Sequence, residues 1–456
     1  MRTFFISAII LFTALSFIAQ WRKPQSSPAG KTMLTWVTDD NPARREQMAL
    51  FREFCVAKGR PDIDIKLDPT NAGMDKVVVQ SVGGVGPDLF DMYERGQLVS
   101  YHDAGILEDL TDTANRRGFG LDILWPALRD AATVDGRQYS MPTNCASTAL
   151  FYNKDLFDKL GVPYPKGDWT WDEFVETAKR LTRRKADGRG YESYGVMGYG
   201  IEECIWQAGG RFFSDDGTKC VLDSPEAVAG ARFYHDLQYR HHVMPTAAEE
   251  SAMSSAGGWG TGSLNYFMGG HIGMIVSGRF AVIQWRKYPN LRIGVAPMPH
   301  GREHANRLLW RSTGVNVRGK NKDASMLFAE FLASEPYNRN INSGGDGLSA
   351  IPRYADTPEF RFDPRFPNET DNALWIEQMK HSKGLEMTPY ASPFITQTIT
   401  DGQRDLIRSG KVDPETAMKT AARKINALIQ RNIERDPVVR ERYLADRAVK
   451  TGGANP

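Results

Sequence analysis

The order in which strand and helix patterns alternate constrains the fold of this chain more than any other feature. Met33–Val37 alternates as a strand does, and Pro42 then stands at the first position of a helical pattern. Further strands are predicted over Asp62–Leu67 and Asp88–Met92. This alternation predicts an α/β lobe, and ligands bind such lobes at the carboxyl ends of their strands. The loops at 39–40 and 93–95 are therefore candidates for a ligand cleft.

A second block with the same alternation begins near Met141. Thr170 and Glu173 form a capping box at the start of the clearest helical pattern in the chain. At roughly 100 to 200 residues per domain, a length of 456 residues predicts two or three lobes, and we take two as the working number. The strands expected in the rest of the chain are Ala149–Asn153, Ile272–Val276 and Leu291–Val295, and the helices are Thr170–Leu181, Ala324–Leu332 and Pro414–Ile429.

The charge balance excludes one broad class of function. The chain carries 57 Lys and Arg against 55 Asp and Glu, a net charge of +2. Nucleic-acid binding needs a strong positive field, so no nucleic-acid partner is expected. With 41% hydrophobic and 25% charged residues, the chain has the composition of a globular protein with a large core.

The amino terminus indicates export. Phe4–Ala19 is a run of sixteen apolar or small residues without a charge, and a polar stretch follows it. At about 1.5 Å per residue this run would span roughly 24 Å as a helix, less than a bilayer core of about 30 Å. Residues 1–30 are therefore predicted to be a signal peptide or a retained anchor, and the protein is expected in the periplasm or elsewhere outside the cytoplasm. No Cys precedes Cys55, so a lipid-modified cysteine is absent.

The four cysteines are too few to form a disulfide scaffold in a chain of 456 residues. An oxidising compartment permits a bridge between Cys204 and Cys220, and buried thiols are the alternative. No CxxC spacing indicates a metal or redox site.

Several segments together resemble a known family. They include GPDLFDMYE, YHDAGILEDLTD, DGRQYSMPTNCASTALFYNKDLFDKLGV, WTWDEFVETAKRLT and YFMGGHIGMIVSGRFAV, in this order. The chain resembles bacterial extracellular solute-binding proteins of sugar transport, the maltodextrin-binding-like group, from about Met33 to about Ile429. The resemblance implies a two-lobed periplasmic-binding-protein fold of the type II kind. Its lobes, joined by crossing segments, close over one solute and deliver it to the permease of an ABC transporter.

On this basis we expect a monomer with a specific division of the chain. Lobe 1 takes residues 31–142 with 286–335, lobe 2 takes 143–285 with 336–446, and residues 447–456 form a flexible tail. Two features depart from the family pattern. Gly278 is followed by Arg279 and Phe280, where the family commonly has Trp, and the usual lipid anchor is missing.

A sugar presents hydroxyl groups at its edge and an apolar face, so its cleft needs polar side chains beside aromatic rings. For each aromatic candidate, core packing is the competing interpretation, and Arg279 either forms a local salt bridge or selects an acidic sugar. Trp259 lies in the small and polar segment SSAGGWGTG, which favours a loop. The predicted ligand-binding residues are Asp39, Asp40, Tyr93, Glu94, Asn144, Glu202, Trp206, Trp259, Arg279, Phe280, Trp310 and Tyr390.

Enzymatic alternatives have weaker support. His300–His304 matches the HxxEH pattern of zinc proteases, but Gly301 and two nearby prolines disfavour the helix that the protease needs. The neighbouring carboxylates Glu202 and Glu203 do not establish the separation that glycoside hydrolysis requires. We therefore predict no catalytic residues, no metal and no cofactor. The alternatives to a transport protein are a secreted carbohydrate-active hydrolase and the sugar-binding subunit of a sensor.

Overall fold

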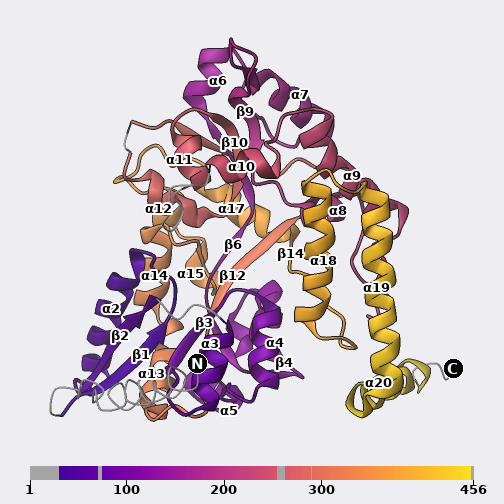
Figure 1. The fold of residues 1–456 in the computed structure, drawn as a ribbon. Helices are drawn as coiled ribbons and strands as arrows, with labels where there is room; N and C mark the ends of the chain where they lie inside the picture. Colours follow the sequence, from indigo (N-terminus) through magenta and orange to yellow (C-terminus); the bar gives the residue numbers. More distant parts are fainter. Residues whose placement is uncertain (1–29, 70–73, 254–261, 289, 453–456) are drawn as a thin grey trace, which may run out of the picture.

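The computed structural model describes residues 30–69, 74–253, 262–288 and 290–452. The predicted signal segment before Gly30 and the predicted site residue Trp259 lie outside these residues. The described chain forms two α/β lobes joined by long crossing strands (Figure 1). The predicted two-lobed α/β fold is confirmed.

The first lobe is built on a seven-stranded sheet with the order β13-β6-β12-β3-β1-β2, and β14 pairs with β12. Strands β1, β2 and β3 are parallel, whereas β12 runs antiparallel to β3 and β6. The strands are β1 (Thr32–Val37), β2 (Ile63–Asp68), β3 (Leu89–Met92), β6 (Ser140–Ser147), β12 (Asn306–Val315), β13 (Leu348–Ser349) and β14 (Ser382–Lys383). The helices in this part of the fold are α2 (Ala43–Ala57), α3 (Met74–Val82), α4 (Arg95–Asp103), α5 (Thr111–Arg117), η2 (Leu121–Ile123), η3 (Pro126–Ala131), α13 (Lys322–Leu332), α14 (Glu335–Gly344), α15 (Pro352–Ala355) and α16 (Pro358–Arg361), beside the small hairpin of β4 (Thr133–Val134) and β5 (Arg137–Gln138).

The second lobe contains a five-stranded sheet with the order β11-β7-β10-β9-β8. Its strands are β7 (Ala149–Asn153), β8 (Arg183–Arg184), β9 (Tyr191–Met197), β10 (Ile272–Ser277) and β11 (Ile293–Ala296). The remaining helices are α6 (Lys154–Leu160), α7 (Trp171–Leu181), α8 (Ile201–Gln207), α9 (Pro225–Tyr239), α10 (Ala247–Met253), α11 (Gly262–Met268), η4 (Arg279–Ala281), α12 (Val282–Trp285), α17 (Asn372–Gln378), η5 (Met379–His381), α18 (Pro393–Arg408), α19 (Pro414–Arg435) and α20 (Pro437–Gly452).

Apolar periodicity explains how helices attach to these sheets. Phe51 of α2 packs edge-on against Phe328 of α13 with ring centroids 4.9 Å apart, and Trp36 of β1 contacts the same ring. All three side chains are buried in one core. In lobe 2 the predicted capping box starts α7, since the Thr170 hydroxyl accepts from the Glu173 backbone N–H and the Glu173 carboxylate accepts from the Thr170 N–H at 2.7 Å.

The crossing strands join the lobes. Strand β6 pairs with β12 from Ser147 opposite Leu308 to Ser140 opposite Gly314, with a register shift after Arg311. The chain leaves β6 through Thr148 into β7, and it returns from β11 through residues 297–305 into β12. Figure 1 shows both strands running between the lobes. They are thus continuous sheet strands of lobe 1 that also form the connection.

Two segments lie in a different lobe from the one predicted for them. Strand β11 pairs with β7 in the five-stranded sheet, although residues 286–335 were assigned to lobe 1. Helix α14 leads into β13, which pairs with β6 in the seven-stranded sheet, although residues 336–446 were assigned to lobe 2. Periodicity identifies a strand but does not determine which sheet it joins, because both sheets offer an apolar face.

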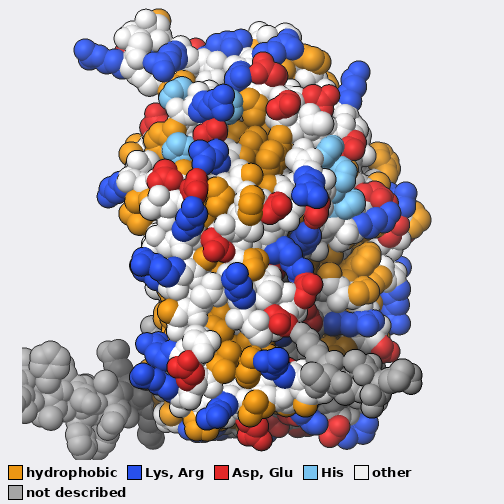
Figure 2. Space-filling view, turned by 90° about the vertical axis from the view of Figure 1, so that its right-hand side faces the viewer, with side chains coloured by type: hydrophobic (Ala, Val, Ile, Leu, Met, Phe, Trp, Pro, Cys, Tyr) orange, Lys and Arg blue, Asp and Glu red, His pale blue; other side chains and the backbone are white. Residues whose placement is uncertain are grey.

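All four cysteines lie in the described residues, and each is a buried thiol without a disulfide bond. The proposed bridge between Cys204 and Cys220 is therefore not formed. Among the described residues, no helix is both long and apolar enough to cross a membrane. Figure 2 shows one face of the molecule, on which basic and acidic side chains are interspersed. This mixture agrees with the balanced charge of the sequence.

Candidate ligand-binding cleft

A cleft lies where the carboxyl end of β3 and the start of β12 face the carboxy-terminal helices. Its larger cavity has a volume of about 810 Å³. Tyr93, Glu94 and Trp310 line it on the side of lobe 1, and residues 384–389 and 391–393 with parts of α19 and α20 line the opposite side. A smaller cavity of about 270 Å³ shares Glu94 with it and extends to Glu202. Most small-molecule sites have volumes of roughly 300 to 1,000 Å³. The larger cavity lies within this range and the smaller one just below it.

Buried charges fix the loops that border this cleft. Arg44, at the start of α2, pairs with Asp39 at 3.0 Å and with Asp346. Arg311 of β12 lies 3.4 Å from Asp91 and 3.8 Å from Asp346. Both guanidinium groups are buried, and removing one partner of a buried pair leaves an uncompensated charge. The network therefore holds the ends of β1, β3 and β12 in one arrangement.

The two carboxylates on the strand ends have opposite pKa shifts. Burial raises the pKa of Asp91 despite the nearby Arg311. The Asp91 carboxylate accepts from Trp36 Nε1 at 2.8 Å and from the Thr313 hydroxyl at 2.6 Å. Burial opposes ionisation of Asp39 too, but Arg44 and Arg311 outweigh it and hold the pKa of Asp39 below its usual value. Asp39 is thus a fixed anion behind Tyr93, which lines the larger cavity.

The loop after β3 carries two of the predicted site residues. The Tyr93 hydroxyl donates to the Asp39 carboxylate at 3.1 Å, which orients the ring beside the end of β1. Glu94 occupies the N-cap position of α4, and its carboxylate accepts from the Gln397 amide of α18 at 3.0 Å and lies 3.7 Å from Arg307. Glu94 is therefore a contact between lobe 1 and the carboxy-terminal helices.

Lobe 2 contributes two adjacent carboxyl groups from α8. Glu202 lies 3.4 Å from Arg404 of α18. Burial, followed by the charge of Glu202, raises the pKa of Glu203 to about 7. The Thr148 hydroxyl, at the crossing between the lobes, donates to Glu203 at 3.2 Å. Glu202 therefore lies at the smaller cavity, and Glu203 lies at the crossing between the lobes.

The structure brings some predicted residues together. Tyr93, Glu94 and Trp310 line the larger cavity, and Glu202 joins Glu94 in the smaller one. Four other predicted residues line neither of these two cavities. Asp39 contacts Tyr93, Asp40 is exposed beside it, Asn144 donates to the Asp346 carbonyl, and Phe280 is half-buried in η4.

Three predicted residues need correction because they are buried against protein groups. Trp206 is 0% exposed and donates to Glu386 at 2.9 Å, and Tyr390 is 1% exposed and donates to Asp446 at 2.8 Å. Both rings are thus core residues, the competing interpretation for aromatics. The buried Arg279 guanidinium donates to the carbonyls of Asn342 at 3.0 Å and Gly347 at 2.9 Å, so in this arrangement it contacts the chain and not a solute.

Sequence reasoning missed the residues that α18 and the preceding loop bring to the cleft. Among them are Glu386, Gln397 and Arg404, and β12 adds Arg307. They come from segments far along the chain, and the sequence pattern around them gives no sign of a cleft. Arg311 did have a signal, because a charged residue inside a long strand pattern must find a partner when it is buried.

A two-lobed α/β fold with a polar and aromatic cleft between its parts defines the class of two-lobed ligand-binding proteins. The chain belongs to the bacterial extracellular solute-binding protein family, whose model matches residues 41–339.

Three similar proteins span most of the chain. A binding protein of Brucella abortus (strain 2308) is 23% identical over 378 residues, which cover 81% of this chain and 86% of that protein. The maltotriose-binding protein of Pyrococcus abyssi is 24% identical over 320 residues, 67% of this chain and 63% of that protein. An ABC substrate-binding protein of Listeria monocytogenes, solved with cycloalternan, has 24% identity and a TM-score of 0.74, and covers 88% of this chain and 99% of its own.

Proposed function

We propose that this protein captures a sugar or an oligosaccharide outside the cytoplasm and delivers it to the permease of an ABC transporter. The observation that carries the proposal is the larger cavity, where the Trp310 and Tyr93 rings lie beside the Glu94 carboxylate and Arg307. Aromatic faces pack against the CH groups of a sugar, while charged and amide groups bind its hydroxyls. The maltotriose and cycloalternan of the two similar proteins support the same class of ligand.

The proposed mechanism is lobe closure. A solute that contacts both sides of the cleft stabilises the closed state by its differential affinity, and the crossing strands β6 and β12 act as the hinge. The proposal includes no catalytic turnover and no cofactor. We further propose that the protein is a monomer and that it associates with the membrane through its amino-terminal segment or through the permease.

A thermal-melt screen of the purified protein tests the ligand class. Neutral and acidic mono- and oligosaccharides, amino acids, polyamines and organic phosphates are compared, because a ligand of the native state raises the melting temperature. We expect a rise with one class of sugar. A rise with an amino acid or polyamine alone would show that the sugar assignment is wrong, and release of smaller sugars from the ligand would instead favour the hydrolase.

A pair of variants tests the site. Trp310→Ala removes a face of the larger cavity and should weaken sugar binding by roughly 1 kcal/mol or more. Tyr288→Ala, an exposed aromatic after α12 that lines neither cavity, is the control and should bind normally. Equal affinities of the two variants in calorimetric titration would remove Trp310 from the site.

A further inference from the structure

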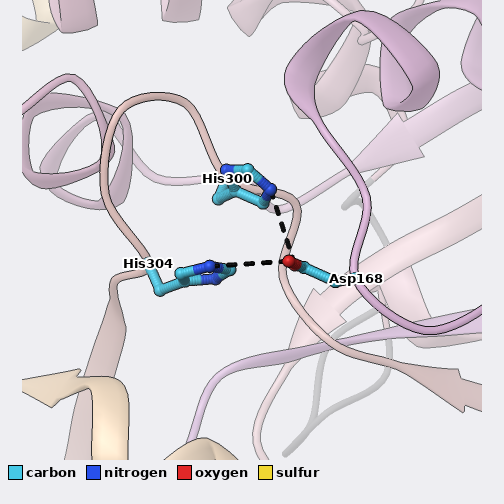
Figure 3. Close-up of side chains that lie close together, drawn as sticks. All are labelled: Asp168, His300 and His304. Atoms are coloured by element: carbon cyan, nitrogen blue, oxygen red, sulfur yellow. Dashed lines mark ion pairs between the residues drawn. The ribbon is translucent and has the colours of Figure 1, made fainter.

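Two histidines and an aspartate meet away from the cleft. Asp168 lies in the segment before α7, while His300 and His304 lie in the loop 297–305 that connects β11 to β12. Figure 3 shows both imidazole rings directed at the Asp168 carboxylate. The three residues each offer one ligand atom, and these atoms lie within 4.8 Å of one another. The loop thus brings both histidines of the HxxEH segment together without the helix that the protease pattern requires.

The separations suit a metal ion better than direct hydrogen bonds. His300 Nε2 is 3.5 Å from one Asp168 oxygen, and His304 Nε2 is 3.6 Å from the other. Such distances are long for a hydrogen bond between nitrogen and oxygen. In a tetrahedral zinc site with bonds of about 2.0 to 2.1 Å, neighbouring ligand atoms lie about 3.3 Å apart. The three ligand atoms lie within 4.8 Å of one another, so the side chains would have to draw together by up to about 1.5 Å to reach that spacing.

The backbone holds His300 in place. Its N–H donates to the Trp169 carbonyl at 3.0 Å, and its carbonyl accepts from the Trp171 N–H at 2.9 Å. His300 Nδ1 lies 2.9 Å from the Gly301 carbonyl. A proton on Nδ1 would be donated there, which leaves the Nε2 lone pair directed at Asp168. Histidine ligands of metals are commonly oriented by such a contact to a carbonyl.

The other end of the loop is fixed to α8. The Gln207 carbonyl accepts from the Glu303 N–H at 3.0 Å, and the Gln207 amide donates to the Ala305 carbonyl at 2.7 Å. These bonds hold His304 between two anchored residues. The Glu303 carboxylate lies 3.4 Å from Lys383. Glu303 is thus held in an ion pair, whereas the protease pattern requires it as a general base, so the cluster has metal ligands without that catalytic group.

A cavity beside the cluster gives access to water, and the imidazole of His381 lies next to His304. A cavity of about 610 Å³ is lined by Asp168, His304 and His381, among others. The His381 ring lies beside His304, with centroids 5.2 Å apart.

We propose that Asp168, His300 and His304 form a binding site for one divalent transition-metal ion of the zinc type, with water or His381 in the fourth position. Two imidazoles and one carboxylate are ligands that Zn²⁺ prefers. The ion would tie the loop that enters the crossing strand β12 to the segment before α7. The site is independent of the proposed solute cleft, with which it shares no residue.

Calorimetric titration of ZnCl₂ into the tag-free, chelator-treated protein tests the site. We expect one ion per chain with a dissociation constant of roughly 10 µM or below. His304→Ala and Asp168→Asn should each weaken binding by about tenfold or more. Both side chains are at least 44% exposed, so these variants should fold normally. The control His271→Ala removes an exposed histidine outside the cluster and should leave binding unchanged.

Two further readouts make the test decisive. ZnCl₂ should raise the melting temperature of the parent protein and of His271→Ala, but not of a His300→Ala, His304→Ala double variant. Binding should weaken from pH 7.5 to pH 5.5, because both imidazoles must lose their protons to bind the ion. Binding weaker than about 100 µM, or equal binding by the double variant, would overturn the proposal.

Discussion

Arg311 shows how one side chain supports the cleft. It is 2% exposed on β12, and its Nε donates to the Thr143 hydroxyl at 2.8 Å while Nη2 donates to the Tyr337 hydroxyl at 2.9 Å. Together with the carboxylates of Asp91 and Asp346, these acceptors surround the guanidinium from β6, β3, α14 and the loop before β13. A buried charge so fully partnered rigidifies its surroundings more than it adds net stability.

Replacement of Arg311 should therefore be costly. Arg311→Met leaves Asp91 and Asp346 as buried carboxylates without this cation, and the free energy of unfolding should fall by about 3 to 5 kcal/mol. Urea denaturation measures the loss. Arg45→Met, at an exposed position on α2, is the control and should change stability little. A loss of stability as small as that of Arg45→Met would show that the fold does not depend on Arg311 to balance the buried carboxylates.

Glu203 should make stability depend on pH. Its pKa is about 7 in the fold against 4.5 for the ordinary group, so the folded chain binds more protons than the unfolded chain between these values. Stability must then fall as the pH rises from about 4.5 through 7. Glu203→Gln should raise the melting temperature at pH 8 and have little effect at pH 4.5. The exposed Glu53→Gln should show no such difference. Equal effects of Glu203→Gln at both pH values would contradict the shift.

At the scale of elements, η4 joins the two lobes through Arg279. This short helix follows β10 of the five-stranded sheet, yet its guanidinium bonds to the carbonyls at the end of α14 and before β13 of the other lobe. Nε also donates to Asn372 at 3.2 Å. A planar fork can reach acceptors in several directions at once, which an ammonium group cannot.

Arg279→Lys should therefore destabilise the protein although it keeps the charge. We expect a loss of about 1.5 to 3 kcal/mol, the usual contribution of hydrogen bonds to a charged group. The exposed Arg292→Lys, which also keeps a positive charge, is the control. Thermal and urea unfolding should both show this loss of stability for Arg279→Lys and little change for Arg292→Lys. An unchanged midpoint for Arg279→Lys would show that the contact between the lobes is replaceable.

The elements themselves were largely predictable, and their partners were not. The capping box of Thr170, the helix after Pro42 and the strand 149–153 follow from local patterns that the structure confirms. The site depends on pairings between distant residues, such as Glu94 with Gln397. Local sequence carries no information about such pairs. Trp206 shows the same limit, because only the fold determines whether a ring lies in the core or in the cleft.

At the scale of the whole molecule, the crossing strands connect binding to shape. Because β6 and β12 belong to the sheet of lobe 1, the residues that line the cleft and those that form the hinge share one strand. Trp310 and Arg311 are neighbours on it. A solute bound in the proposed cleft would therefore lie at the pivot, where its contacts would favour closure directly.

A sugar that raises the melting temperature should also make the molecule more compact. Small-angle X-ray scattering should give a smaller radius of gyration at saturating sugar, because the closed state is the one that the ligand prefers. The same sugar should have no effect on Trp310→Ala at a concentration below the weakened dissociation constant of that variant. An unchanged radius in the parent protein at full occupancy would contradict closure.

The cleft wall contributed by α18 has a consequence for how the protein is made. Helix α18 begins only at Pro393, whereas the last described strand, β14, ends at Lys383. A nascent chain that has emerged as far as Lys383 therefore contains every described strand of both sheets but lacks one side of the cleft. Nearly the whole chain must therefore be synthesised before the pocket can form. A chain truncated before α18 would keep most of the strands and helices but would not bind its solute.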